Sequence, residues 1–165
     1  MQPFKLEHFA AAHPQDAFPS FASIASEEIE RLREQLCQAA GIGVGTDWGN
    51  LYKHLQDRAE HVKAVNAEDE TRFNLDVVLK SLSILPNDSV YLAWDPSRGD
   101  VDRIAFADLS RYFDWIWYPA SDDIEIFDES FAWLVFVDHE GQLSVDWLRD
   151  REGTAPLDGM NQFGS

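Results

Sequence analysis

Residues 122–147 read DDIEIFDESFAWLVFVDHEGQLSVDW, and this stretch carries the clearest secondary-structure pattern of the chain. Strands are predicted at Ile124–Phe127 and Ala132–Val137, and the second run is apolar on both faces, which is typical of a central strand. Asp138-His-Glu-Gly141 is typical of a hairpin turn, because glycine readily adopts a positive φ. Gln142–Trp147 is the returning strand, so the stretch predicts three consecutive antiparallel strands.

The first half of the chain shows helical spacing instead. Ser26-Glu27-Glu28 is typical of a helix start, because serine caps the first turn and the helix dipole favours acids there. Apolar residues three and four apart predict helices from Ser26 to Gly41, from about Asp47 to Val65 and over Leu75–Leu85. Residues 1–22 are expected to be irregular, with a short helical piece at most. The residues expected to face inward are Ile29, Leu32, Leu36, Trp48, Leu51, Leu55, Val62, Leu75, Val78, Leu79 and Leu82.

The segment between these two parts changes period. Ser89–Trp94 and Asp102–Phe106 are rich in β-branched and aromatic residues, so two more strands are predicted there. Asp108–Asp114 fits a helical turn. Trp115–Tyr118 fits either a strand or the end of that helix.

The whole pattern predicts one α+β domain over residues 1–150. Residues 1–86 are expected to be helical and residues 87–148 sheet-rich. Two or three N-terminal helices should pack on one face of a mainly antiparallel sheet of about five strands. Residues 151–165 contain glycine and proline and are expected to form a flexible tail.

The chain is strongly acidic, with 13 Lys and Arg against 30 Asp and Glu and a net charge of −17. Such a surface repels phosphate and anionic lipid, so direct binding to nucleic acid or membrane is not expected, whereas basic proteins are attracted. No apolar run approaches the roughly 18 residues of a membrane span, and the start lacks a signal-peptide pattern. Cys37 is the one cysteine. A cytoplasmic location is therefore expected.

Motifs for catalysis or metal binding are weak. His54, Asp57 and His61 would share one face of the predicted second helix, but a zinc site needs further convergent ligands, so no metal is expected. Residues 41–45 (GIGVG) resemble a phosphate-binding loop but follow a helix, which favours a simple connection between helices. Cys37 lies beside an apolar stripe, and no hydrolase motif occurs. We therefore expect that the protein binds no cofactor and is not an enzyme.

The acidic residues near the predicted strands are the candidate binding residues, because residues 112–148 contain no Lys or Arg. Strand alternation predicts that Asp123 and Glu125 point away from the core and that Ile124 and Ile126 point into it. Charged strand edges also prevent aggregation, but a strip of one sign favours a basic partner. The candidate partner-binding residues are Asp122, Asp123, Glu125, Asp128, Glu129, Asp138 and Glu140, with Trp117 and Tyr118 at the border of the strip.

Residues Asp123–Gly141 resemble the C-terminal strand–turn–strand of small bacterial toxin-immunity proteins, including those of contact-dependent growth inhibition. In these proteins one strand ends in Phe-Asp-x-Ser/Thr-Phe-x-Trp, as in Phe127–Trp133, and the next ends in a His-Glu or His-Asp turn, as at His139-Glu140. The resemblance implies a small acidic protein that binds and neutralises a basic nuclease domain. It assigns no catalytic residue.

Three functions therefore enter as hypotheses. The first is an immunity protein that neutralises a cognate toxin domain, a cationic nuclease, through its acidic surface. The second is a small cytoplasmic enzyme or ligand-binding domain that uses the aromatic C-terminal half as its pocket. The third is an adaptor or chaperone for a secreted effector.

Overall fold

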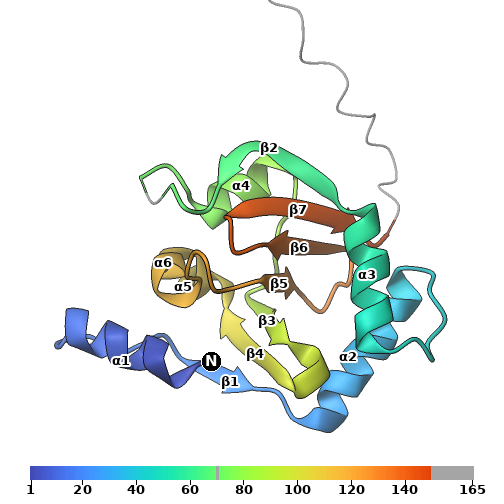
Figure 1. Cartoon of the computed structure of the whole chain (residues 1–165), viewed down its shortest axis with the longest axis horizontal. Coiled ribbons are helices and arrows are strands. Elements are labelled where there is room, and N and C mark those ends of the chain that lie inside the picture. The colour runs from blue at the N-terminus through green and yellow to red at the C-terminus, as the bar shows by residue number, and fades with distance from the viewer. Residues whose placement is uncertain (70, 150–165) are drawn as a thin grey trace, which may run out of the picture.

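The computed structural model describes residues 1–69 and 71–149. Within them the strands form one antiparallel sheet of seven strands in the order β1-β4-β3-β5-β6-β7-β2 (Figure 1). The strands are β1 (Phe21–Ser23), β2 (Glu60–Asn66), β3 (Ser89–Asp95), β4 (Asp100–Ala105), β5 (Ile124–Phe127), β6 (Trp133–Val137) and β7 (Gln142–Trp147). The helices are α1 (Pro3–Ala12), α2 (Ser26–Ala39), α3 (Trp48–Arg58), α4 (Leu75–Ser81), α5 (Phe106–Arg111) and α6 (Phe113–Ile116), with the 3-10 turn η1 (Pro96–Arg98).

The three strands predicted from residues 122–147 are confirmed. β5, β6 and β7 lie side by side, with Ile126 opposite Val135 and Val135 opposite Val145. Gly141 has a φ of 74°, and a Cβ at this position would lie 2.2 Å from the Asn66 side-chain oxygen. Glycine is therefore required in this turn both for its backbone conformation and for its lack of a side chain.

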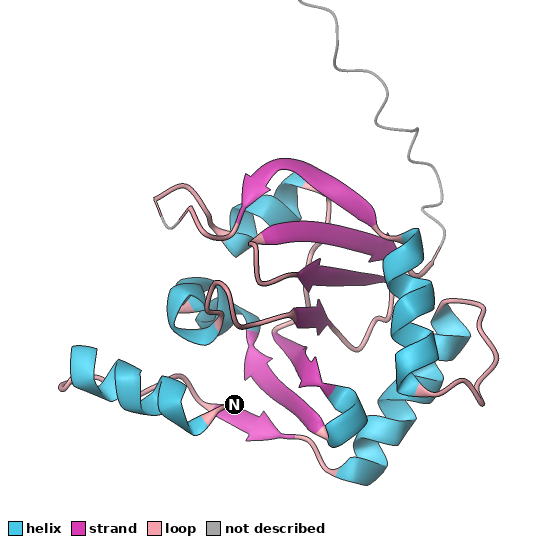
Figure 2. Ribbon diagram, viewed as in Figure 1, coloured by secondary structure: helices cyan, strands magenta, loops and turns pink. Residues whose placement is uncertain are grey.

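Helices cover both faces of the sheet (Figure 2), so the prediction of helices on one face is wrong. Ile124 and Ile126 pack in a core cluster with residues of α4, α5 and α6. Phe127 and Leu134 belong to a second cluster with residues of α2 and α3. All five residues of β6 are buried, which requires cover on both sides of that strand. The predicted core positions Leu32, Leu51 and Leu55 all lie in the second cluster.

The second predicted helix is shorter than its periodicity indicates. α3 ends at Arg58, and the residues up to Val65 lie in the edge strand β2 instead. Ala59 has extended backbone angles, and Glu60 then pairs with Val145 of β7. Strand pairing with a distant part of the chain therefore overrides the helical spacing at Val62. This strand and β1 bring the sheet from the expected five strands to seven.

The N-terminal segment and residues 106–118 are more regular than expected. Pro3 occupies the first turn of α1, where the missing N–H costs no hydrogen bond, and β1 pairs with β4 at Phe21 and Ile104. Trp115 lies in α6, which ends at Ile116, so the start of the Trp115–Tyr118 segment is the end of a helix and not a strand. None of the helices in the described part of the chain has the length and hydropathy that crossing a membrane requires. The predicted tail at 151–165 lies outside the described residues.

Candidate functional site

The predicted acidic strip is not one continuous exposed surface, because α2 and α3 cover the face of β5 that was expected to meet solvent. Some of its residues are accessible to solvent, and others are buried inside the fold. The buried members are Asp122 (4% exposed), Glu125 (8%), Asp128 (1%) and Trp117 (2%). The exposed or half-buried members are Asp123, Glu129, Asp138, Glu140 and Tyr118.

Asp122 binds a cation of its own chain. Its carboxylate pairs with the ammonium of Lys5, which also donates to the main-chain carbonyl of Ile116 at 2.5 Å. The same carboxylate accepts a hydrogen bond from the main-chain N–H of Tyr118 at 2.7 Å. The negative charge of Asp122 is therefore used inside the fold.

Glu125 faces α3, where the hydroxyl of Tyr52 lies beside it. The pKa of Glu125 is raised to about 8, first by burial and then by the charges of Asp123 and Asp95, and a hydrogen bond with Tyr52 offsets part of this rise. Its Oε2 atom is buried without a hydrogen-bond partner among the described residues. The carboxyl is thus largely protonated at neutral pH and forms no electrostatic contact surface.

Asp128 organises the loop between β5 and β6. Its carboxylate accepts hydrogen bonds from the main-chain N–H groups of Asn87 and Ser130, both at 2.9 Å. Phe131 in this loop has a φ of 47°, a conformation that non-glycine residues rarely adopt. Asp128 therefore has a structural role, and only its neighbour Glu129 reaches solvent.

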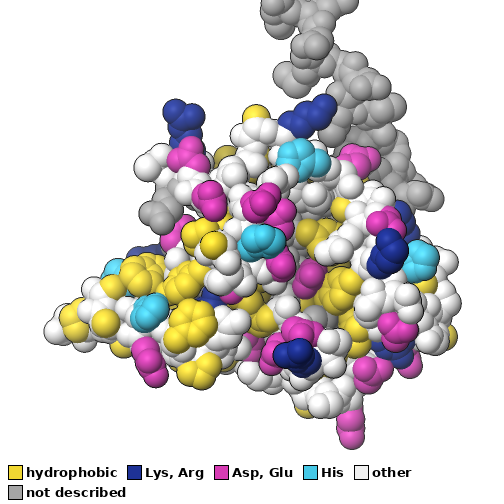
Figure 3. All heavy atoms as spheres, in the orientation of Figure 1, with side chains coloured by type: hydrophobic (Ala, Val, Ile, Leu, Met, Phe, Trp, Pro, Cys, Tyr) yellow, Lys and Arg dark blue, Asp and Glu magenta, His cyan; other side chains and the backbone are white. Residues whose placement is uncertain are grey.

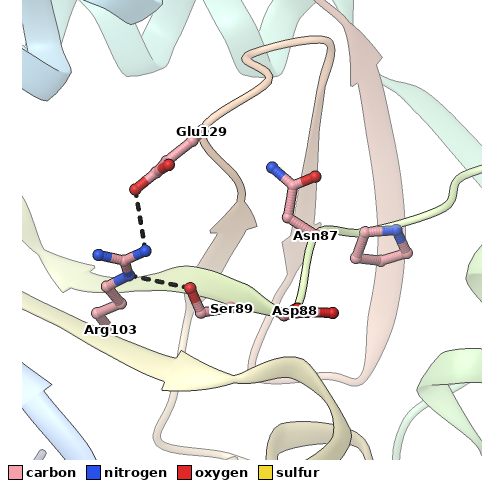
Figure 4. A pocket seen from close by; sticks show the side chains of 6 residues that line it. Asn87, Asp88, Ser89, Arg103 and Glu129 are labelled. Carbon is pink, nitrogen blue, oxygen red and sulfur yellow. Dashed lines mark hydrogen bonds and ion pairs between the residues drawn. The ribbon is translucent and has the colours of Figure 1, made fainter.

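Glu129 lies at the rim of a cleft of about 440 Å³ that is also lined by residues 86–89 (Figure 4). Figure 4 shows Glu129 reaching toward Arg103, which binds it at 3.0 Å and donates to the Ser89 hydroxyl at 3.0 Å. The acid at this end of β5 is therefore already paired with a base.

The opposite end of β5 lies beside the turn between β6 and β7. Asp123 accepts a hydrogen bond from the main-chain N–H of His139 at 2.9 Å, and its carboxylate lies 2.9 Å from the His139 ring nitrogen Nδ1. This contact raises the pKa of His139, first through the hydrogen bond and then through the charge of Asp123. The Asp138 carboxylate accepts hydrogen bonds from the main-chain N–H groups of Glu140 and Gln142, both at 2.9 Å, and these bonds close the turn.

A fourth carboxylate joins this end of the sheet from the segment after β2. The main-chain N–H of Ala67 donates to the Gly141 carbonyl at 2.8 Å, and the Asn66 amide donates to the Glu140 carbonyl at 3.1 Å. These bonds place the exposed residue Glu68 against the turn. We define the acidic turn as Asp123, Asp138 and Glu140, which lie around His139, together with Glu68, which lies against Gly141.

An aromatic patch, defined as Phe4, His8 and Tyr118, lies next to the acidic turn. The ring centroids of Phe4 and His8 lie 5.8 and 6.1 Å from that of Tyr118, and Phe4 is 39% exposed. The loop after Tyr118 joins the two surfaces, because the N–H of Ala120 donates to the His139 carbonyl at 2.7 Å. Figure 3 shows hydrophobic side chains gathered over α1 and α6, beside acidic and histidine side chains over the turn between β6 and β7.

Three residues of this surface were not among the predicted ones. Phe4 and His8 are four residues apart and share a helix face, a signal that is readable once residues 3–12 are taken as a helix. Glu68 carries no local signal, because its position depends on pairing between β2 and β7. His54, Asp57 and His61 were expected to share one helix face, but His61 lies on β2 while the other two lie on α3. Among residues 1–69 and 71–149, no three His, Cys, Asp or Glu side chains are grouped as metal ligands.

Comparison with known proteins finds no matching family model, no matching curated protein and no matching solved structure. The chemistry of the surface is therefore the basis for assigning a function. Four carboxylates beside three exposed or half-buried rings match a protein surface that carries Lys or Arg beside an apolar anchor.

Proposed function

We propose that this chain is a toxin-immunity protein that binds a cognate cationic nuclease domain and blocks it, without catalysing a reaction itself. The observation that supports this most directly is the acidic turn beside the aromatic patch. A nuclease must carry positive charge to hold phosphate, so an acidic surface that covers this charge excludes the substrate.

The two parts of the surface have different tasks in the proposed complex. The acidic turn attracts the positive surface of the toxin over a distance and speeds association. The rings of Phe4 and Tyr118 lose water on contact, pack against the partner and slow dissociation.

The test is co-expression with a candidate toxin. If the gene lies beside one for a large secreted protein that ends in a basic domain, that domain is the candidate toxin. The wild-type chain should protect the cells. The double variant Glu68→Lys/Glu140→Lys should protect poorly, because it reverses two exposed charges of the acidic turn. Its matched control is Glu34→Lys/Asp57→Lys, which makes the same change in net charge on α2 and α3.

Both double variants change the net charge by the same amount. They should therefore differ in protection only if the acidic turn contacts the toxin. Protection by the control at the wild-type level, with loss of protection by the first variant, is the expected result. Full protection by both, with unchanged affinity in vitro, would refute the acidic turn as the binding surface.

A further inference from the structure

A fully buried lysine attaches α1 to the body of the protein. The side chain of Lys5 is 0% exposed, and lysine is almost never fully buried unless it is paired. Its ammonium lies 4.6 Å from the ring centroid of Trp94 and 4.4 Å from that of Tyr118. It also pairs with Asp122 and donates to the carbonyl of Ile116 at 2.5 Å. Two rings, a carboxylate and a carbonyl thus form a closed site for this cation.

This cation site joins parts of the molecule that are far apart in sequence. Trp94 lies in β3, Ile116 ends α6 and Asp122 precedes β5, while Lys5 comes from the first turn of α1. Loss of the ammonium would leave a buried carboxylate without its counter-ion, which is unfavourable. Lys5 therefore fixes the N-terminal half of α1, beside the N-terminal ammonium of Met1, which pairs with Asp102 of β4.

The second buried side chain of α1 lies one turn further on. Phe9 makes edge-to-face contacts with Tyr112 and Trp115, at centroid distances of 5.7 Å each. It attaches the C-terminal half of the helix independently of the cation site. A change at Lys5 should therefore loosen the start of α1 without removing the whole segment from the sheet.

We infer that Lys5 is a positioning residue for partner binding. By holding α1 on the cation site, it places Phe4 and His8 against Tyr118 and so completes the aromatic patch. Two of the three rings of that patch come from α1, so the patch exists only while the helix is in place. This inference rests on the proposed function, and it gives Asp122 an indirect role in binding, through Lys5.

The first measurement needs no partner. Lys5→Met keeps the length of the side chain and removes its charge, and Lys53→Met is the matched control, since Lys53 lies exposed on α3 and pairs with Asp57. Hydrogen exchange of the first turns of α1 should become about tenfold faster or more in Lys5→Met, because a buried carboxylate loses its partner. Exchange in β5, β6 and β7 should be unchanged, and Lys53→Met should match the wild type.

The second measurement is the binding kinetics with the cognate toxin domain. Lys5→Met should dissociate about tenfold faster, whereas its association rate and the salt dependence of that rate stay at the wild-type values, because the acidic turn is intact. If Lys5 had only a structural role, Lys5→Met would change the stability of the protein but neither the association rate nor the dissociation rate. Phe4→Ala removes an exposed ring and leaves α1 attached, and it should also speed dissociation. This variant tests the aromatic patch if Lys5→Met fails to fold.

Two results would overturn the inference while the proposed function survives. One is unchanged exchange of α1 in Lys5→Met. The other is a loosened α1, or a missing Phe4 ring, with dissociation as slow as in the wild type. Absence of toxin binding by the wild type would instead refute the proposed function and the binding role of Lys5 together. The hydrogen-exchange measurement needs no toxin, so it would still show whether Lys5 positions α1.

Discussion

Two carboxyl groups three residues apart, Asp122 and Glu125, are both buried, yet the fold treats them in opposite ways. Asp122 meets the ammonium of Lys5 and the N–H of Tyr118, so its charge is compensated. Glu125 lies against α3 without a cation, and its pKa rises to about 8. The difference teaches that burial alone does not set the charge of a carboxyl group; the partner that the fold brings to it does.

Removing Asp122 is the strongest way to test this contrast. Asp122→Ala leaves the ammonium of Lys5 buried without a counter-ion, and the free energy of unfolding should fall by about 3–5 kcal/mol. Denaturant titration at pH 7 measures this loss. Adding Lys5→Met should recover a large part of it, because an apolar replacement of the whole pair is often neutral. A loss below about 1 kcal/mol would show that the pair is exposed in solution.

Glu125→Gln should have a somewhat smaller effect of the opposite sign. The folded protein holds a proton on Glu125 up to pH 8 or so, whereas the unfolded chain releases it near the ordinary pKa of 4.5. Wild-type stability is therefore fully present below that ordinary value and falls as the pH rises toward the folded-state pKa.

Glutamine carries no ionisable proton, so Glu125→Gln should escape this loss. It should be roughly 2–4 kcal/mol more stable than the wild type at pH 9 and closely similar to it at pH 4. Urea melts at the two pH values give the comparison. Equal stability at pH 9 would mean that Glu125 finds a cation or water in solution.

An exposed ion pair should matter much less than the buried one. The ammonium of Lys53 lies 3.1 Å from the Asp57 carboxylate, with both side chains well exposed. Lys53→Ala should change the free energy of unfolding by no more than about 0.5 kcal/mol, because solvent screens such pairs. A loss similar to that of Asp122→Ala would remove the distinction between the two pairs.

His139 should produce the smallest effect, a change in binding rate with pH. Asp123 raises the pKa of His139, and Asp138 and Glu140 add to this. Protonation offsets part of the charge of the acidic turn, so association with a cationic toxin should be slower at pH 6 than at pH 8. His139→Gln should flatten this dependence. A rate that changes with pH equally in both proteins would assign the effect to another group.

The sequence predicts those parts of the fold that depend on residues close together in the chain. Gly141 and the apolar run of β6 indicate the hairpin directly, and two acids of the strip, Asp123 and Glu140, are exposed as expected. The burial of Glu125 could not be read locally, because it depends on α3 covering that face of the sheet.

The attachment of α1 to the sheet could not be predicted from the sequence either. Lys5 and Asp122 lie 117 positions apart, and nothing in the spacing of either residue indicates the other. The change from α3 to β2 has the same cause, since Glu60 pairs with Val145 at the far end of the chain. Long-range contacts thus decide which acids of the strip are free to meet a partner.

The rate of association with the cognate toxin domain, measured against salt concentration, tests the central claim most directly. The wild-type rate should fall steeply as salt increases if, as proposed, the acidic turn attracts the toxin. Glu68→Lys/Glu140→Lys should associate about tenfold more slowly at low salt and with a flatter salt dependence, while Glu34→Lys/Asp57→Lys stays close to the wild type. Equal losses in the two variants would contradict the account, since they would assign attraction to the net charge of the molecule and not to the acidic turn.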